Sequence, residues 1–343
     1  MHDNNIIKLP TIILSANKDG DIILAADIIK QGGVVALPTE TVYGLAAKGL
    51  CAESIKKIYQ AKNRPQTNPV ILHVSSLEQA YKLVNLSDLA LRRFEKLSSL
   101  WPAALTIIAK KSNIVPDEVS FGLDTVALRM PNHETTLKII SLVNQPLAMP
   151  SANLSTRPSP TSASHVLSTL NNRIDAVLDG GECSLGLESS VVSIFDTQVY
   201  LLRLGTFSQQ QIEDALEEKV VLSLNNKAKP LSPGQSFLHY SPKVAEIKFI
   251  SFSEIMTYWQ SDCSILLTKS QYELAASLSE RPKDSITLNM PDEAIDYAKK
   301  FYDALYFFES APQKPLILVE PEHKGGIWLA IKERMSKAAD KCT

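Results

Sequence analysis

The stretch GVVALPTETVYGLAAKGL, residues 33–50, places several small hydroxyl groups directly after a short apolar run. The apolar run has the β-branched composition of a buried strand, and Pro38 ends it. A strand interior does not need Thr39 and Thr41, whereas a binding loop at the end of a strand does. We therefore expect a loop in which Pro38 fixes the turn, Gly44 allows a close approach and the two threonines donate to a ligand.

The chain up to residue 222 alternates short apolar runs with amphipathic helical patterns. Strands are predicted at 33–39, 69–74, 105–110, 125–130 and 190–195. Helices are predicted at 52–62, 89–101 and 208–218. This alternation predicts an α/β or α+β domain around a twisted sheet.

A second α/β pattern follows a segment without periodicity. Residues 223–243 contain three prolines, a glycine and four serines, and are predicted to form an ordered linker. Beyond them, strands are predicted at 246–250, 263–268, 285–289 and 315–320, with helical segments between them. That order predicts a small doubly wound parallel sheet. The predicted domains are therefore 1–222 and 244–343, and the second has no Gly-x-Gly-x-x-Gly dinucleotide motif.

Composition excludes several classes of protein. The net charge is −2, from 35 basic and 37 acidic residues, so the chain is not a globally basic nucleic-acid coat. None of the four cysteines forms a Cys-x-x-Cys pair, which disfavours zinc and disulfide frameworks and favours a reduced, cytoplasmic setting. We expect no signal peptide and no membrane span. P-loop, His-Glu-x-x-His and Gly-x-Ser-x-Gly motifs are absent, so neither a metal site nor a nucleophile triad is predicted.

Two polar stretches beside predicted strands are candidates for a binding site. AKNRPQTNP (61–69) places Lys62 and Arg64 at a helix end, where they either complement the helix C-terminus or clamp a phosphate. MPSANLSTRPSPT (149–161) holds five Ser or Thr residues among three prolines. The prolines restrain the hydroxyls of Ser151 and Ser159, which suits recognition of a triphosphate or ribose.

Two arginines interrupt apolar runs. Arg129 lies in TVALRMP (125–131) and Arg203 in LLRLGTF (201–207). An arginine in a buried strand is costly unless it meets an anion, so the pair suggests a shared anionic ligand. Arg203 has a second interpretation, as a surface residue with its head in water. His73 is by itself more typical of a hydrogen-bonded structural residue.

The motifs together resemble one family. LPTETVYGLAA, KNRPQTNPVILHV, TVALRMP, PSANLSTRPSPT, GLESSVV and RLG occur in that order in the YrdC-like threonylcarbamoyl-adenylate synthases. SPGQSFLHYSP (232–242), followed by an α/β module, is similar to the long two-domain members. The resemblance covers nearly the whole chain. It implies an open twisted α/β sheet of the YrdC-like, double-stranded-RNA-binding type, plus a smaller Rossmann-like C-terminal domain.

The resemblance also implies an activity. Family members are nucleotidyltransferases that make threonylcarbamoyl-AMP from L-threonine, bicarbonate and ATP, with release of pyrophosphate. Mg²⁺ accompanies the ATP. The product serves threonylcarbamoylation of the tRNA adenosine beside the anticodon, so the expected partners are the tRNA transfer machinery and, weakly, tRNA itself. The carbamate is already an oxygen nucleophile, so positioning and charge neutralisation are enough for catalysis.

The resemblance assigns roles to single residues. Those implied to contact threonine are Thr41, His73, Arg129, Met149 and Ser189. Those implied to contact ATP are Arg64, Asn68, Thr125, Ser151, Ser159, Arg203, His239 and Tyr240. Lys62 and Arg64 are the residues expected to assist catalysis at the phosphates. Met149 stands where a small residue is usual and is expected to reshape the amino-acid pocket.

Residues 232–242 are expected to close over the nucleotide as a lid that excludes water. A non-catalytic RNA-binding module of the same fold is the competing hypothesis. A third hypothesis, a carbamoyl-handling maturation factor, is weakened by the linker motif and the second domain. The low overall positive charge and the lack of interleaved aromatic residues argue against RNA binding as the sole function.

Overall fold

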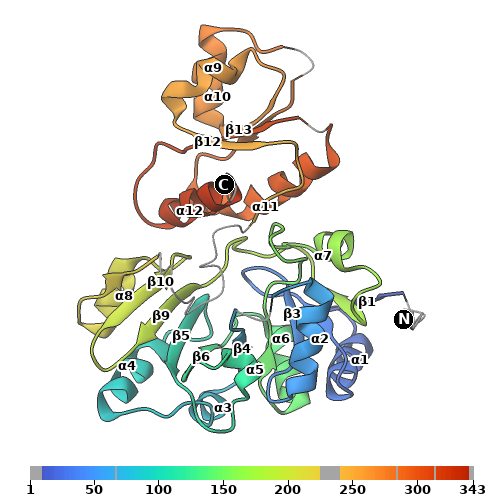
Figure 1. The fold of residues 1–343 in the computed structure, drawn as a ribbon, viewed down its shortest axis with the longest axis vertical. Coiled ribbons are helices and arrows are strands. Elements are labelled where there is room, and N and C mark those ends of the chain that lie inside the picture. Colours follow the sequence, from blue (N-terminus) through green and yellow to red (C-terminus); the bar gives the residue numbers. More distant parts are fainter. Residues whose placement is uncertain (1–9, 66–67, 225–239, 283–284, 313, 340–343) are drawn as a thin grey trace.

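The computed structural model describes residues 10–65, 68–224, 240–282, 285–312 and 314–339. These residues form two β-sheets, each covered by helices (Figure 1). The strands of the first sheet are β1 (Ile12–Ser15), β2 (Val35–Leu37), β3 (Gly44–Lys48), β4 (Ile71–His73), β5 (Leu105–Lys110), β6 (Thr125–Arg129), β7 (Leu147–Ala148), β8 (Ala176–Asp179), β9 (Ser190–Ile194), β10 (Val199–Arg203) and β11 (Val221–Leu222).

The large sheet is mixed and has the order β1-β8-β2-β3-β7-β4-β6-β5-β9-β10-β11. All five strands predicted for this half are present, as β2, β4, β5, β6 and β9, most of them shorter than predicted. They are the β-branched segments, and their side chains are almost all buried, which is why composition alone identifies them. The prediction of an α/β domain around a sheet is confirmed.

The loop predicted after Pro38 is short. Gly44–Lys48 forms β3, which pairs antiparallel with β2, so the loop between the two strands is only residues 38–43. Alanine has a low strand propensity, and the sequence GLAAK therefore does not indicate a strand. Burial decides the outcome here, since Leu45, Ala46 and Ala47 are fully buried in the centre of the sheet.

Helices cover both faces of the large sheet. They are α1 (Asp19–Lys30), α2 (Ala52–Lys62), α3 (Leu77–Tyr81), α4 (Asp88–Ser98), α5 (Asp117–Ser120), α6 (Glu134–Val143), α7 (Ala163–Leu170) and α8 (Gln209–Leu216). The predicted helix at 52–62 is confirmed with its apolar face inward, because Ile55, Ile58 and Tyr59 are buried. Among the described residues, no helix is both long and apolar enough to cross a membrane.

The second sheet is parallel and has the order β12-β15-β13-β14. Its strands are β12 (Ile247–Ile250), β13 (Ser264–Thr268), β14 (Thr287–Met290) and β15 (Leu316–Val319). Its helices are η1 (Phe252–Glu254), α9 (Ile255–Trp259), α10 (Lys269–Leu278), α11 (Ala294–Ser310) and α12 (Ile327–Ala339). The predicted small doubly wound sheet is confirmed. The exact division at 1–222 and 244–343 stays a prediction, although each sheet lies within its range.

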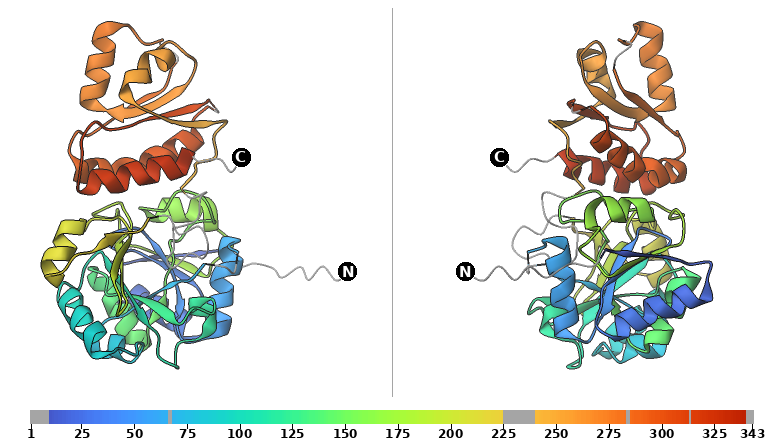
Figure 2. Two further views of the ribbon diagram at one scale, coloured as in Figure 1. Left: turned by 60° about the vertical axis from the view of Figure 1, so that its left-hand side comes forward. Right: turned by 90° about the vertical axis from the view of Figure 1, so that its right-hand side faces the viewer.

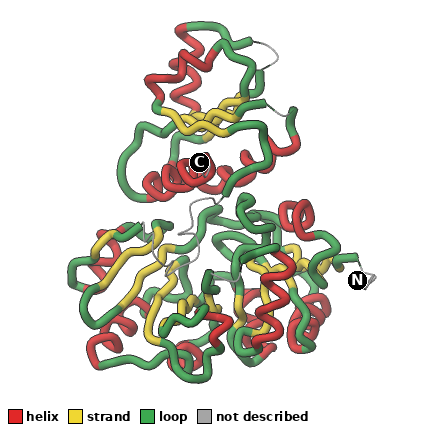
Figure 3. The backbone as a smooth tube through the Cα atoms, in the orientation of Figure 1, coloured by secondary structure: helices red, strands yellow, loops and turns green. Residues whose placement is uncertain are grey.

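The small domain rests on the large one through α11 and α12. Figures 1 and 2 show these two helices between the small sheet and the large domain, while α9 and α10 cover the opposite face. In Figure 3 the part of the large domain nearest α11 is drawn mostly as loop. Polar contacts join the two: the Tyr306 hydroxyl donates to the Pro158 carbonyl at 2.9 Å, and the Thr161 hydroxyl donates to Asp303 at 2.6 Å.

Gly186 allows the closest approach between the domains. It has φ +69°, and a Cβ there would lie 2.5 Å from the Ala298 carbonyl oxygen of α11. Gly181 has φ +80° but open space around its Cα. Both glycines therefore have a positive φ that disfavours other residues, but only Gly186 is in close contact with α11 of the second domain.

We predict that Gly186→Ala destabilises the protein more than Gly181→Ala. Both variants carry the cost of a left-handed alanine, about 1 kcal/mol. Gly186→Ala also forces α11 away, which adds about 1 to 3 kcal/mol. The measurement is the free energy of unfolding in denaturant for both variants. Equal losses would mean that the contact with α11 does not limit the fit of the domains.

Candidate functional site

A pocket in the large domain lies where the loop 38–43, the ends of β4 and β6, the segment after β7 and the β9–β10 hairpin meet. It has a volume of about 50 Å³. Its lining residues are Thr39, Thr41, Val42, Gly44, Arg64, Ile71, His73, Arg129, Met149, Pro150, Ser151, Glu188, Arg203 and Tyr240. The set combines three arginines with one carboxylate, so the pocket is suited to anionic groups.

The loop 38–43 is organised around the Thr39 hydroxyl. It donates to the Val42 carbonyl at 2.7 Å and accepts from the Thr41 amide at 3.1 Å. The Thr41 hydroxyl lies 2.9 Å from it. Side-chain to backbone bonds of this kind hold a short loop in one conformation. Thr41 is therefore held at the pocket by the fold rather than by a ligand.

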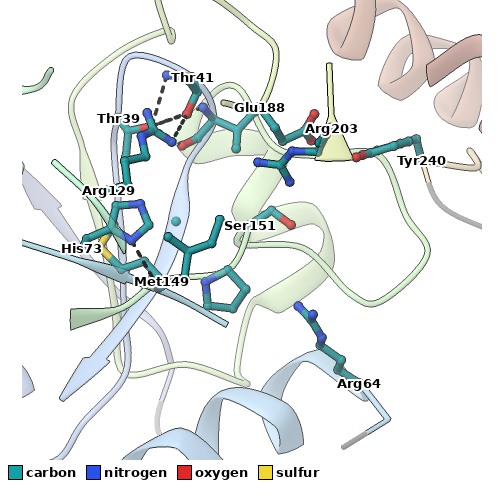
Figure 4. Close-up of a pocket in the computed structure, with 14 residues that line it drawn as sticks. Thr39, Thr41, Arg64, His73, Arg129, Met149, Ser151, Glu188, Arg203 and Tyr240 are labelled. Carbon is teal, nitrogen blue, oxygen red and sulfur yellow. Dashed lines mark hydrogen bonds between the residues drawn. The ribbon is translucent and has the colours of Figure 1, made fainter. Parts of the chain in front are cut away.

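Arg129 defines one end of the pocket (Figure 4). Its strand β6 pairs in parallel with β4, and the register places Arg129 beside His73. Arg129 Nη1 donates to the Thr41 hydroxyl at 3.0 Å, and Nη2 lies 2.7 Å from Glu40 Oε1. Among the described residues, Arg129 Nε has no hydrogen-bond acceptor, whereas Nη2 lies in the ion pair with Glu40 and lacks only hydrogen-bond geometry. The Nε–Nη2 side of a guanidinium can hold a carboxylate in two-point fashion, and here Nη2 is shared with Glu40.

Arg203 and Arg64 lie at the other end, with Ser151 between the two ends (Figure 4). Arg203 is buried, and its Nε and Nη2 donate to the Ser189 carbonyl and hydroxyl at 2.9 and 3.0 Å. Arg64 is partly buried and donates to the Asn68 and Pro69 carbonyls at 3.4 and 3.2 Å. Arg203 is therefore not a surface residue with its head in water, and the second of its two interpretations is wrong.

Each end of the pocket has a buried carboxylate beside its arginine. Glu40 pairs with Arg129, and Glu188 lies near Arg203 and accepts from the Ser159 hydroxyl at 2.6 Å. Burial alone would raise the pKa of Glu188, but the charges of Arg334 and Arg203 lower that pKa to about 2. Glu188 is therefore ionised at neutral pH. The expectation that the buried arginines meet only a shared ligand is incomplete, because the protein supplies part of the balancing charge.

The structure brings most of the predicted site residues together. Those that line the pocket are Thr41, Arg64, His73, Arg129, Met149, Ser151, Arg203 and Tyr240. Ser159 and Ser189 lie one layer behind, where they bond Glu188 and Arg203. The backbone carbonyl of Asn68 lies near the pocket and accepts hydrogen bonds from the Tyr59 hydroxyl and the Arg64 guanidinium. His239 lies outside the described residues, as does most of the predicted lid at 232–242.

Lys62 is placed differently from the prediction. Its ammonium is buried and donates to the carbonyls of Ser151 and Asn153 and to the Asn153 side chain. Burial and the charge of Arg64 lower the Lys62 pKa well below its usual value. These bonds anchor the loop after β7, which carries the lining residue Ser151. Lys62 is not among the lining residues, and its catalytic role stays a prediction.

Thr125 is also outside the pocket. It begins β6, whereas Arg129 ends that strand, and Thr125 lines a separate hollow with Asn85 and Asp196. A strand advances about 3.3 Å per residue, so Thr125 lies roughly 13 Å from Arg129 along β6. The structure therefore offers no contact that would support the predicted ATP-binding role of Thr125.

Four residues that bear on the pocket were not predicted. Glu40 and Glu188 lie inside the family motifs, in which binding roles were assigned to the neighbouring hydroxyl residues. A glutamate within an otherwise buried run needs a cationic partner, and that signal would have identified both. Tyr302 and Arg334 come from the second domain and bond Glu188. No local pattern connects them to a residue more than a hundred positions away.

Comparison with known proteins adds a family relationship. The model of the Sua5/YciO/YrdC family, described as "Telomere recombination", matches residues 27–205. The model described as the C-terminal domain of threonylcarbamoyl-AMP synthase matches residues 207–340.

Two curated relatives extend over almost the whole chain. Threonylcarbamoyl-AMP synthase of Pyrococcus abyssi is 34% identical and covers 96% of this chain and 98% of its own length. Threonylcarbamoyl-AMP synthase of Bacillus subtilis is 37% identical, and the match covers 95% of this chain and 94% of that protein. The solved structure of P. abyssi Sua5 complexed with L-threonine superposes with a TM-score of 0.84 at 30% identity, and covers 96% of this chain and 97% of that one.

We predict that His73 makes the stability depend on pH. Burial and the charge of Arg129 lower the His73 pKa to about 3, far below the value near 6.5 of an unfolded chain. The unfolded state therefore binds the proton first as the pH falls. The free energy of unfolding that the neutral His73 ring contributes above pH 6.5 is consequently lost as the pH falls toward 3. Between pH 7.5 and 5.5 we expect a loss of about 1.4 kcal/mol of unfolding free energy from His73.

Urea unfolding at the two pH values measures this effect, with His73→Gln as the matched control. The variant should lose about that much of the pH dependence. An NMR titration that places the pKa of the His73 ring near 6.5 would contradict the prediction.

Proposed function

This chain belongs to the Sua5/YciO/YrdC family, in the long form that also carries the threonylcarbamoyl-AMP synthase C-terminal domain, and we propose that it is a threonylcarbamoyl-AMP synthase. The observation that carries the proposal is the pocket itself. It has Arg129 at one end and Arg64 and Arg203 at the other, and hydroxyl-bearing loops of the family motifs lie between the two ends. Its substrates are L-threonine, bicarbonate and ATP, and its products are threonylcarbamoyl-AMP and pyrophosphate.

The reaction needs no nucleophile from the protein. The threonine amine and bicarbonate give a carbamate and water. A carbamate oxygen attacks the α-phosphorus, the bond from that phosphorus to the β-phosphate oxygen breaks, and pyrophosphate leaves with its electron pair. The protein has to hold both reactants in line and neutralise phosphate charge. A pocket lined by arginines and fixed hydroxyls supports these two tasks.

Arg129 is the group that suits the threonine carboxylate. Its Nε has no hydrogen-bond acceptor among the described residues, and its Nη2 is shared with Glu40, which holds the guanidinium in place. Thr41 and His73 flank it, and the low pKa of His73 keeps the ring neutral, so that it does not compete for the carboxylate. Met149 packs against Gly44 at this end, because a Cβ on Gly44 would lie 2.7 Å from Met149 Cε.

Arg64, Arg203, Ser151 and Tyr240 suit the nucleotide. The two guanidiniums lie at the end of the pocket away from Arg129, so threonine and the triphosphate would enter from opposite sides (Figure 4). The carbamate then forms between them, near Ser151. This arrangement supports an in-line approach to the α-phosphorus.

Mg²⁺ is assigned to the nucleotide rather than to the protein. Glu188 is the one carboxylate among the lining residues, and it is engaged by Ser159, Tyr302 and Arg334. Among the described residues no three His, Cys, Asp or Glu side chains gather to hold a metal. Hard cations prefer several oxygen ligands, so the lining does not fit a resident ion. The ion would enter on the phosphates of ATP and neutralise their charge.

The product would pass to the machinery that transfers the threonylcarbamoyl group to tRNA, in the cytoplasm. A non-catalytic RNA-binding role is not favoured. The cationic side chains Arg129 and Arg203 are buried in the pocket instead of lying on a surface open to nucleic acid.

Release of pyrophosphate tests the proposed function. The purified full chain with Mg²⁺ should release pyrophosphate only when ATP, L-threonine and bicarbonate are all present. Omission of any one of the three is the control. Release from ATP alone would indicate a simple ATP pyrophosphohydrolase. Its absence with all three substrates would contradict the proposal.

Two variants should separate the two ends of the pocket. Arg129→Lys loses the two-point fork, so we expect the threonine KM to rise about tenfold or more with little change for ATP. Arg64→Ala removes a charged donor to the phosphates, so kcat/KM for ATP should fall about 10- to 100-fold. Each variant is the control for the other in separate titrations of threonine and ATP. Equal losses for both substrates in Arg129→Lys would contradict its assignment.

A further inference from the structure

We propose that Tyr302 and Arg334, from the second domain, are positioning residues for the nucleotide end of the pocket. They hold the Glu188 carboxylate and the Tyr240 ring at that end of the pocket, and they give Glu188 a cationic neighbour in addition to Arg203. The inference rests on the proposed function, because it names what the second domain contributes to ATP binding. Both residues lie outside the domain that contains the pocket.

The first observation is the set of bonds to Glu188. Its carboxylate lines the pocket from the large domain. The Tyr302 hydroxyl of α11 lies 3.0 Å from both carboxylate oxygens, and Arg334 Nε of α12 lies 3.3 Å from Oε2. Tyr302 and Arg334 are fully buried, so these contacts are shielded from water and are strong. Two of the three side chains that bond Glu188 in this way belong to the second domain.

The second observation is the placement of Tyr240. Its ring lies between the same two residues, 5.6 Å from the Arg334 guanidinium and 5.7 Å from the Tyr302 ring. Cation–π and tilted aromatic contacts of this kind hold a buried ring in one orientation. Tyr240 is only 1% exposed and lines the pocket on its nucleotide side. The second domain therefore supports two lining residues at once.

The third observation is the charge balance. Arg334 also bonds the Glu333 carboxylate at 2.6 Å, and Glu333 in turn bonds Lys337 at 2.6 Å. With Arg203, this buried and partly buried group holds three cations and two carboxylates, which leaves one positive charge. Removal of Arg334 leaves two of each, and Glu188 then has Arg203 as its nearest counter-charge. Arg203 would be neutralised by the protein, and ATP would lose part of its electrostatic partner.

The arrangement predicts a loss that is specific to ATP. Tyr302→Phe removes one hydroxyl from Glu188 and keeps the ring against Tyr240, so the fold should be preserved. We expect ATP to bind about three- to tenfold more weakly, with threonine affinity unchanged. Tyr297→Phe is the matched control, because Tyr297 is equally buried on α11 and its hydroxyl contacts the Met335 sulfur. The control should leave both affinities as they are.

Substitutions of Arg334 test the charge argument. Arg334→Gln should weaken ATP binding more than Tyr302→Phe does, and Arg334→Lys should restore part of it by keeping the charge. In the double variant Arg334→Gln with Glu188→Gln, loss of the carboxylate removes the need for a counter-charge, so ATP affinity should return toward that of the unmodified chain. A purely structural role for Arg334 predicts no such recovery.

The measurement is calorimetric titration of the full chain with Mg–ATP and, separately, with L-threonine, and thermal melting reports on folding. Equal losses for ATP and threonine, or an unchanged ATP affinity in folded Tyr302→Phe and Arg334→Gln, would overturn the inference and leave the proposed function intact. Failure of the unmodified chain to bind ATP would overturn the proposed function first, and this inference with it.

Discussion

Two arginine side chains are buried at the pocket of the large domain, and the arrangement of the pocket follows from the need to balance them. A buried guanidinium without an anion costs several kcal/mol, roughly the scale of a whole domain's stability. Arg129 is balanced by Glu40, and Arg203 is bonded by Ser189 and feels the charge of Glu188. These contacts fix the guanidiniums in the absence of substrate. The pocket is therefore organised for anions before any anion arrives, which avoids the cost of ordering long side chains on binding.

The same balance explains why a pocket without a catalytic nucleophile is suited to adenylate formation. The work of such a site is to bring two anions together, a carbamate and a triphosphate, which repel each other in water. Fixed positive charge at both ends offsets that repulsion, and the low local dielectric strengthens the attraction of each arginine for its anion. The loops between the ends contribute hydroxyls and carbonyls that are already bonded to each other, so the protein changes little during the reaction. A mixed anhydride formed in an enclosed pocket is also protected from water.

The sequence was informative where physical chemistry leaves a local pattern. Strands rich in Val and Ile, such as β5 and β9, and the amphipathic helix α2 follow directly from composition and periodicity. β3 and β7 do not, because alanine-rich or two-residue strands exist only through burial between neighbours. For the site, an arginine in an apolar run was enough to identify Arg129 and Arg203. The bonds of Lys62 to the loop after β7 do not follow from the sequence, which does not show which way a side chain at a helix end points. The bonds between Glu188 and the second domain join residues 114 and 146 positions apart, which no spacing argument reaches.

The contacts of Glu188 limit how independently the two domains can evolve. A large domain separated from α11 and α12 would keep a buried carboxylate and lose two of its bonded neighbours. Arg203 would then be the nearest cation to that carboxylate, unless the position carried a neutral residue. Exchange of the second domain between relatives carries a related condition, since the two incoming helices must present a hydroxyl and a guanidinium to one particular carboxylate. The two domains are thus separate segments of the chain, but the charge of Glu188 is balanced by residues of both. Changes in either domain are therefore constrained by the other during evolution.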